Sequence, residues 1–227
     1  MATFVLVHGA WHGGWCWEAV ADELALAGHR VIAPTSSGLA ERRHVEGTLS
    51  RHVDELAGLL YFSDLREVVL VGHSYGGLVI TGAAVRAPGR IARMVYLDAF
   101  VAGDGESLFD LLRPERRKVY EESAVDGLVP SPAPEVFGVS GERAGWLADR
   151  LTDQPVATFT EPLELKFEPA VPRLYVRCTS GPMTASFSGF AVRFRDTAGW
   201  EVVDFDSGHD AMITRPDDLA ALLATSG

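Results

Sequence analysis

The sequence predicts an α/β protein whose central sheet is mostly parallel and is covered by helices on both faces. Short apolar runs rich in β-branched residues, such as Glu67–Val71, lack the polar alternation of half-exposed strands and are typical of buried ones. Segments of helical length separate these runs, and the alternation resumes after residue 172. Strands that alternate with helices are joined by crossovers, so they pair in parallel and both faces of their sheet are covered.

The first hundred residues contain most of the expected elements. Gly28 ends the first helix and Pro34 stops the second strand. Thr48 is placed to cap a helix in which apolar residues such as Leu49 and Val53 recur at helical spacing. We expect strands at 4–7, 30–33, 67–71 and 93–97, and helices at 15–27, 48–62 and 78–85.

A long insertion interrupts this alternation. From residue 104 to residue 168 the strands stop and prolines recur, as at Pro114, Pro130 and Pro162. We expect residues 104–168 to form a mainly helical insertion with loops, over the edge of the sheet. Residues 1–103 and 169–227 would then form one core, with further strands at 173–177 and 201–205 and helices near 188–198 and 215–224.

Composition narrows the functional classes. The 227 residues are 47% hydrophobic and 22% charged, which suits a single globular domain. The formal net charge of −11 repels phosphate backbones, so nucleic acid is not an expected partner. No apolar stretch approaches the roughly 18 residues of a membrane span, and no basic segment precedes the first strand, so we expect no membrane partner and a cytoplasmic location. The two cysteines, Cys16 and Cys178, form no ligand cluster, and we expect no metal and no cofactor.

One serine stands where a strand is expected to turn into a helix. Ser74 lies within Gly72–Gly77 (GHSYGG), directly after the apolar run and before the helix at 78–85. This is the context of a G-x-S-x-G nucleophile elbow, in which glycines relieve crowding and the turn exposes the hydroxyl. Glycine-flanked serines also occur in ordinary tight turns, but the strand before and the helix after favour the elbow.

Three motifs in order resemble a known superfamily. These motifs are Leu6–Trp17 (LVHGAWHGGWCW), the elbow at Gly72–Gly77, and Ser207–Met212 (SGHDAM). Together they resemble the α/β-hydrolase superfamily, and within it the branch of plant methyl esterases, hydroxynitrile lyases and small bacterial esterases. The resemblance implies an α/β-hydrolase fold in which residues 104–168, called the cap below, cover the active site.

A serine nucleophile needs a base that takes its proton. His209 is the best candidate, because it follows a predicted strand near the C-terminus on a loop of small residues, in the nucleophile, acid, base order of this fold. We expect the remaining histidines elsewhere: His73 would point away from the active site, His8 and His12 would hold the loop after the first strand, which contributes to the oxyanion hole in this superfamily, and His29, His44 and His52 would lie at the surface.

The acid is harder to assign. In most members of the superfamily it follows the penultimate strand, but residues 178–182 contain no carboxylate. The fold has a second placement, after the strand beside the elbow strand, and Asp98 occupies it. Two alternatives stay open: Asp98 binds only loop amides, or Ser74 and His209 act as a dyad with water or Thr179 behind the imidazole.

The resemblance also implies an oxyanion hole and a pocket. The amides of Ala10 and Tyr75 would stabilise the developing oxyanion, and Trp11 and Phe100 would line the substrate pocket. Hydroxynitrile lyases of this branch carry a threonine and a lysine where this chain has Gly9 and Asp210, which favours hydrolysis over cyanohydrin cleavage.

We therefore predict a serine hydrolase that cleaves a small or medium, apolar to aromatic carboxylic ester through an acyl-enzyme. Two alternatives remain at this stage. One is a lactone-opening or tailoring hydrolase on a secondary metabolite. The other is a ligand-binding pseudo-enzyme, which the missing acid at 178–182 keeps in view. The expected partner is a small-molecule ester, and a homodimer stays open.

Overall fold

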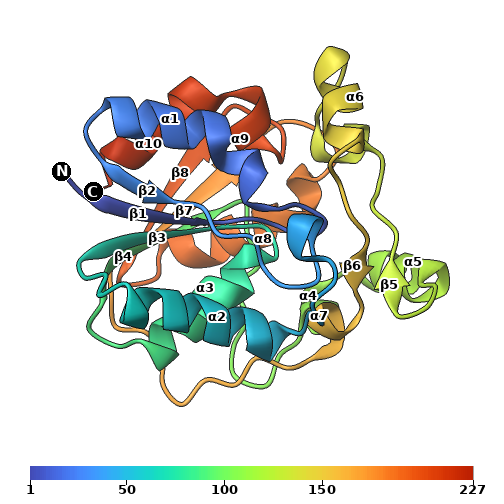
Figure 1. Cartoon of the computed structure of the whole chain (residues 1–227), viewed down its shortest axis with the longest axis horizontal. Coiled ribbons are helices and arrows are strands. Elements are labelled where there is room, and N and C mark those ends of the chain that lie inside the picture. The colour runs from blue at the N-terminus through green and yellow to red at the C-terminus, as the bar shows by residue number, and fades with distance from the viewer. Residues whose placement is uncertain (227) are drawn as a thin grey trace.

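A computed structural model describes residues 1–226 of the chain. Its centre is a six-stranded sheet in the order β2-β1-β3-β4-β7-β8, and every neighbouring pair is parallel (Figure 1). The predicted α/β class is therefore confirmed, with a fully parallel sheet. The strands are β1 (Thr3–Val7), β2 (Arg30–Ile32), β3 (Val68–His73), β4 (Ile91–Leu97), β7 (Arg173–Cys178) and β8 (Trp200–Phe205).

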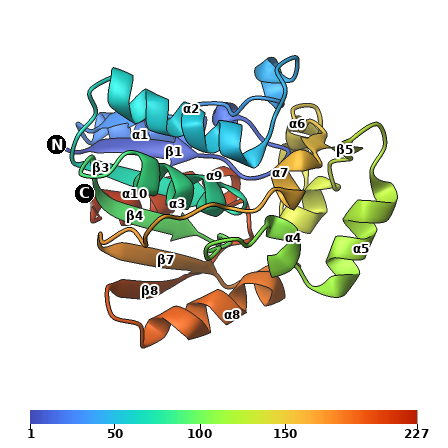
Figure 2. The same cartoon turned by 90° about the horizontal axis from the view of Figure 1, so that it is seen from below.

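Helices cover both faces of this sheet. Helices α1 and α10 lie together on one face, and α2, α3 and α8 lie on the other (Figures 1 and 2). Thr48 caps α2 as expected, because its hydroxyl accepts a hydrogen bond from the Arg51 amide at 3.2 Å. The core helices are η1 (Gly14–Trp17), α1 (Glu18–Leu26), η2 (Ala40–Arg42), α2 (Leu49–Phe62), α3 (Gly76–Arg86), α8 (Thr184–Arg195), α9 (Ala211–Thr214) and α10 (Pro216–Ala224).

Three core helices differ from the prediction, and one of them is η2, a short helix where no helix was expected. Helix α8 begins at Thr184, four residues before the predicted start, because Phe187 opens the apolar face that Ala191 and Phe194 continue. Helix α9 was not predicted, since its four residues are too few to show a period. It begins where the Ile213 amide donates to the Asp210 carbonyl at 3.0 Å.

Residues 104–168 lie at the carboxyl ends of the strands, on the side opposite the N-terminus (Figure 2). They are mainly helix and loop, as expected, but they also contain a short antiparallel pair of strands that the proline-rich sequence had concealed. The cap elements are α4 (Leu108–Leu111), α5 (Pro114–Ser123), β5 (Leu128–Val129), η3 (Pro134–Phe137), α6 (Glu142–Ala148), β6 (Gln154–Pro155) and α7 (Ala157–Thr160).

The register of the sheet sets the position of the site. His73 at the end of β3 pairs with Leu97 at the end of β4, so the residues that follow these two strands are neighbours. Cys178 at the end of β7 pairs with Phe205 at the end of β8. The carboxyl ends of these strands thus bring residues 74, 98 and 209 to the same edge. Among residues 1–226, no helix has both the length and the apolar character needed to span a membrane.

Candidate active site

Ser74 occupies a strained turn between β3 and α3. Its φ of +52° lies in the left-handed region, which costs a residue with a side chain on the order of 1–3 kcal/mol. Three backbone hydrogen bonds hold it there: its amide donates to the Leu97 carbonyl at 3.2 Å, and its carbonyl accepts from the amides of Gly77 and Phe100, both at 3.1 Å. The strain is therefore built into the fold at the residue that the elbow motif singles out.

The flanking glycines allow two close backbone approaches. A Cβ atom at Gly72 would lie 2.7 Å from the Gly76 carbonyl oxygen, and one at Gly76 would lie 2.8 Å from the His8 carbonyl oxygen. Neither distance is compatible with a side chain. The glycines are thus required by the turn, as the motif indicated.

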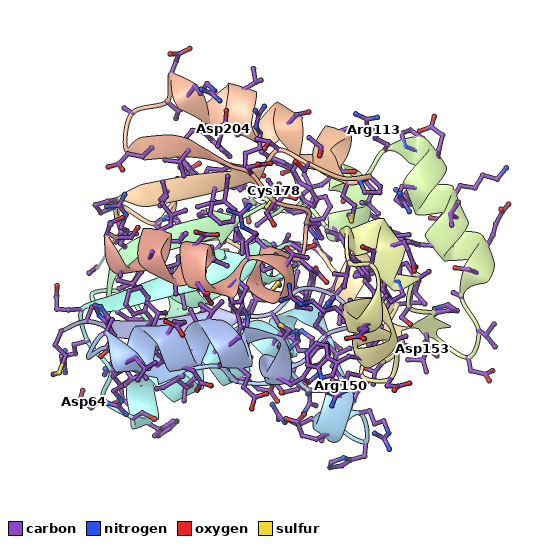
Figure 3. The ribbon with its side chains drawn as sticks, turned by 90° about the horizontal axis from the view of Figure 1, so that it is seen from above. Asp64, Arg113, Arg150, Asp153, Cys178 and Asp204 are labelled. Carbon is purple, nitrogen blue, oxygen red and sulfur yellow. The ribbon has the colours of Figure 1, made fainter. Side chains whose placement is uncertain are left out.

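Asp98 and His209 form a buried pair at the edge of the sheet. The Asp98 Oδ2 atom lies 2.7 Å from His209 Nδ1, and the Cys178 amide donates to Asp98 Oδ1 at 3.1 Å (Figure 3 shows Cys178 inside the core). Asp98 is 1% exposed and His209 is 2% exposed. Burial raises the pKa of Asp98, although the hydrogen bond from His209 opposes this.

The ring of His209 is also fixed by packing. Phe187 of α8 stacks on it with ring centres 4.8 Å apart and planes 11° apart. The His73 ring lies 4.4 Å from it between centres, and His73 Nε2 donates to the His209 carbonyl at 3.1 Å. The His73 side chain is thus bonded to the backbone of the His209 loop, and burial lowers its pKa well below the usual range.

His52 contradicts the sequence prediction. It was expected at the surface, but it is 1% exposed. Its Nε2 donates to the Ser37 carbonyl at 2.7 Å, and its Nδ1 accepts from the Tyr75 hydroxyl at 2.9 Å. The signal that could have found it is its spacing of three residues from Leu49, which places it on the apolar face of α2. Of the two other histidines expected at the surface, His44 is exposed and His29 is partly buried.

Three side chains hold the loop that carries Ala10 by hydrogen bonds to its backbone. His8 Nδ1 donates to the Gly9 carbonyl at 2.8 Å, and His12 Nδ1 contacts the Ala10 carbonyl at 2.7 Å. The Trp11 amide donates to Gln154 Oε1 of the cap at 2.8 Å, a contact the sequence gave no means of predicting. These bonds leave the Ala10 amide itself unused.

Two backbone amides beside Ser74 have no protein acceptor among residues 1–226. These are the amides of Ala10 and Tyr75, the two groups that the resemblance assigned to an oxyanion hole. Unsatisfied amides in a buried place are rare, so an acceptor from a ligand suits this position.

A small cavity of about 20 Å³ lies over Ser74. It has room for roughly one water, so a substrate must displace cap side chains to bind there. Trp11 and Phe100, both expected in the pocket, line it. Most of the other lining side chains are apolar or aromatic, from the core and the cap: Tyr75, Leu108, Leu112, Arg116, Tyr120, Phe159, Met183 and Ser186.

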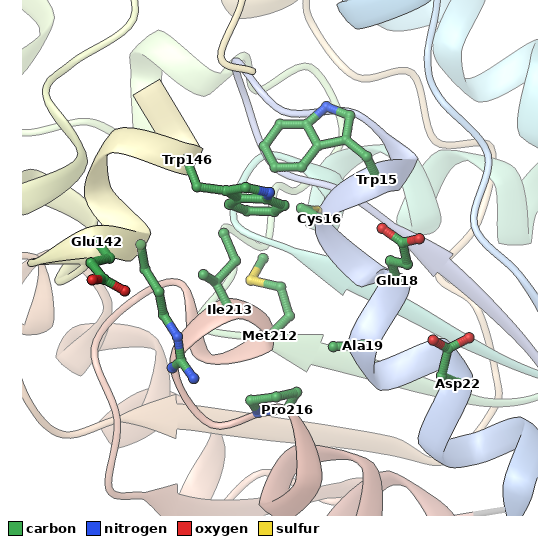
Figure 4. A pocket seen from close by; sticks show the side chains of 11 residues that line it. Trp15, Cys16, Glu18, Ala19, Asp22, Glu142, Trp146, Met212, Ile213 and Pro216 are labelled. Atoms are coloured by element: carbon green, nitrogen blue, oxygen red, sulfur yellow. The ribbon is translucent and has the colours of Figure 1, made fainter. Parts of the chain in front are cut away.

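A larger hollow of about 540 Å³ is lined by residues of α1, α6 and α9 (Figure 4). Trp15 and Trp146 meet edge to face in its wall, with ring centres 5.4 Å apart, and Met212 and Ile213 line it from α9. Ser74 does not line this hollow, so the smaller cavity is the candidate substrate site.

One group of side chains has donor atoms close enough together to be considered for a metal ion. Within residues 1–226, donor atoms of His73, His209 and Asp210 lie within 4.8 Å of one another. However, His209 Nδ1 is bound to Asp98, and the free Nδ1 of His73 faces the backbone of Gly9, where even a Cβ atom would come within 2.8 Å. Both of these ring nitrogens are thus bonded to or enclosed by protein atoms, which disfavours a bound metal ion.

A serine on a strand-to-helix turn beside a buried aspartate–histidine pair, at the carboxyl edge of a parallel sheet, is the arrangement of the α/β hydrolases. Residues 4–222 match the alpha/beta hydrolase family, and the chain belongs to this family.

Known proteins agree with this assignment. The chain is 42% identical to a carbendazim hydrolyzing esterase from a Nocardioides strain, over 100% of both chains. It is 33% identical to methylesterase 10 of Arabidopsis thaliana, over 60% of this chain and 54% of that protein. The fold also superposes on a solved extracellular α/β-hydrolase from a Paenibacillus species, with a TM-score of 0.86 at 26% identity. The match covers 100% of this chain and 99% of that one, and that protein is described as sharing structural and functional homology with tobacco salicylic acid binding protein 2.

The predicted α/β-hydrolase fold and the enzyme class, carboxylic ester hydrolase, are therefore confirmed. The cytoplasmic location and the partners expected from the sequence stay predictions.

Proposed function

We propose that the chain hydrolyses carboxylic esters through an acyl-enzyme on Ser74, with His209 as the base and Asp98 as the acid that orients it. The observation that carries this proposal is the 2.7 Å contact between Asp98 and His209 next to the strained serine turn. It also weighs against a non-catalytic binding protein, which the missing carboxylate at 178–182 had kept in view.

The first half of the reaction forms the acyl-enzyme. Ser74 Oγ attacks the ester carbonyl carbon while His209 Nε2 takes the hydroxyl proton, and Asp98 stabilises the imidazolium through Nδ1–H. The Ala10 and Tyr75 amides then stabilise the oxyanion, at a rate gain of about 10²–10³ for each donor. The tetrahedral adduct collapses, and His209 gives the proton to the leaving alkoxide.

The second half releases the acid. A water attacks the acyl carbon while His209 takes its proton, and the same oxyanion hole stabilises the second tetrahedral adduct. This adduct collapses with cleavage of its bond to Ser74 Oγ, which takes the proton back from His209 as the acid leaves. Ser74 Oγ makes no hydrogen bond to another residue among 1–226, and contacts of this kind often tighten only when the substrate binds.

The cavity supports an apolar to aromatic substrate. Its wall combines aromatic rings of the core and of the cap, and Tyr120 and Phe159 lie 5.8 Å apart between ring centres. Carbendazim, the compound named for the 42% identical relative, belongs among the substrates to be tested.

The experiment is turnover of p-nitrophenyl esters, methyl esters and carbendazim by the wild type, Ser74→Ala and His209→Ala. The matched controls are Ser140→Ala and His44→Ala, which change exposed residues of the same types. We expect the wild type and both controls to turn over, and the two site variants to lose at least about 10³-fold in kcat.

Two results would count against the proposal. A Ser74→Ala variant with near wild-type rates would exclude the acyl-enzyme. A wild type that is inert on the whole panel but reacts with a fluorophosphonate would instead favour the lactone-opening or tailoring hydrolase.

A further inference from the structure

A second buried histidine–aspartate pair adjoins the pair of Asp98 and His209. His12 Nε2 lies 3.0 Å from Asp210 Oδ2, and the two residues are 1% and 0% exposed. His12 belongs to the loop of Ala10, whereas Asp210 directly follows His209. The pair therefore connects the loop of the candidate oxyanion hole to the loop of the candidate base.

The contacts of His12 fix where its proton must be. Nδ1 lies 2.7 Å from the Ala10 carbonyl, which can only accept a hydrogen bond. While the pair keeps both of its protons, one lies between His12 Nε2 and Asp210 Oδ2 and the other is on Nδ1, directed at the Ala10 carbonyl. If the pair loses one proton, Asp210 and the Ala10 carbonyl compete for the proton that stays on the ring, so Asp210 determines whether that carbonyl has a donor.

Asp210 is itself held in place from several directions. Its amide donates to the Phe137 carbonyl of the cap at 3.1 Å, and its carbonyl accepts from the amides of Ile213 and Thr214 in α9, both at 3.0 Å. Trp15, in the wall of the larger hollow (Figure 4), stacks on the His12 ring at 5.5 Å between centres. A carboxylate without its histidine would be costly here, because no water reaches it.

We propose that His12 and Asp210 are positioning residues for ester hydrolysis, which fix the Ala10 amide relative to His209. This inference rests on the proposed function. It adds two residues that do not touch the substrate but fix the direction of the Ala10 amide, through a contact with the carbonyl of the same residue.

Among the titratable groups around the pair, Asp210 has the strongest effect in keeping His12 protonated. Burial lowers the pKa of His12, but the adjacent Asp210 carboxylate more than offsets this, and the pKa is raised. The titratable side chains that face the pair are neutral: burial lowers the pKa of His8 and His73 and raises the pKa of the thiols of Cys16 and Cys178. The carbonyl of His209 accepts a hydrogen bond from His73, and its ring is bonded to Asp98.

These charges predict that kcat declines at alkaline pH. When pH rises through the raised pKa of His12, the ring keeps one proton, and the carboxylate is the stronger acceptor for it. The Ala10 carbonyl then loses its donor, so kcat should decline. In Asp210→Asn the side-chain amide donates to Nε2, the neutral ring keeps Nδ1–H, and that decline should be absent.

The test compares wild type, Asp210→Leu, His12→Phe and the conservative Asp210→Asn on the methyl ester that wild type hydrolyses fastest. Fluorophosphonate inactivation rates are measured in parallel, at a temperature where circular dichroism shows each variant folded. We expect kcat to fall about 10- to 100-fold in Asp210→Leu and His12→Phe, with KM within about threefold of wild type. Asp210→Asn should restore the neutral-pH rate and lose the alkaline decline.

The outcomes separate the two proposals. If wild type hydrolyses esters while Asp210→Leu keeps the wild-type kcat, this inference is overturned and the proposed function stands. A merely structural role would lower the melting temperature without changing kcat of the folded protein or the pH profile. If Asp210→Leu does not fold, an alkaline decline that persists in Asp210→Asn overturns the inference. A wild type that hydrolyses no ester overturns both.

Discussion

The Asp98→Asn substitution tests the assignment of the acid. Asparagine fits this site better than other residues, because Asp98 has a φ of +41° and asparagine tolerates the left-handed region. Its side-chain oxygen can still accept the Cys178 amide. The fold should therefore survive, and only the charge and the direction of the hydrogen bond to His209 should change.

The size of the effect follows from the buried contact. In the transition state His209 carries a positive charge next to Asp98, and two unit charges about 4 Å apart interact by about 4 kcal/mol at an effective dielectric constant of about 20. At 1.36 kcal/mol per decade this corresponds to about 10³-fold in rate. The asparagine amide also donates to Nδ1, which favours the tautomer with its proton on Nε2 and so moves the loss toward about 10⁴-fold.

The assay is kcat/KM on a p-nitrophenyl ester, with thermal unfolding by circular dichroism run on the same samples. Asp206→Asn is the matched control, because Asp206 is exposed and lies three residues before His209. We expect Asp206→Asn to behave as wild type. A folded Asp98→Asn enzyme within about tenfold of the wild-type rate would refute the reasoning and leave a Ser74–His209 dyad as the better description.

Three further predictions follow from the same packing. A Gly9→Ala change places a Cβ atom 2.8 Å from His73 Nδ1 and should lower the free energy of unfolding in urea by about 1–3 kcal/mol. The control Gly189→Ala has open space around the new Cβ atom and should cost no stability, so equal stabilities of the two variants would contradict this. Burial lowers the pKa of His8 to about 3, so the unfolded chain takes up its proton first as pH falls below about 6.5. This histidine should remove about 2 kcal/mol of stability between pH 7 and pH 5, and His8→Asn should show a flatter dependence. Burial raises the pKa of both thiols, so neither cysteine should react with a disulfide reagent until the chain unfolds, and fast native labelling would be inconsistent with the fold.

Elements with a strong local pattern could be predicted from the sequence. The parallel strands are continuous apolar runs, and α2 has both its cap and its apolar spacing within fifteen residues. The turn at Ser74 was predictable for the same reason, because its glycines stand beside it. The contact between Asp98 and His209 joins residues 111 positions apart, and it could be expected only through the resemblance and the order of the strands.

Features that depend on distant partners could not be predicted. The Trp11 amide finds Gln154 across 143 residues, and His12 finds Asp210 across 198. A polar side chain carries no local sign of its partner, so these pairs appear only when the sheet is assembled. His52 was misplaced because its polarity was given more weight than its position on the apolar face of α2.

The central claim is that Ser74 is the nucleophile, and peptide mass spectrometry after fluorophosphonate treatment tests it most directly. The account predicts one label per chain, on the peptide that contains Ser74, and no label in His209→Ala under the same conditions. A label on another residue, or full ester turnover by a chain that takes no label, would contradict it.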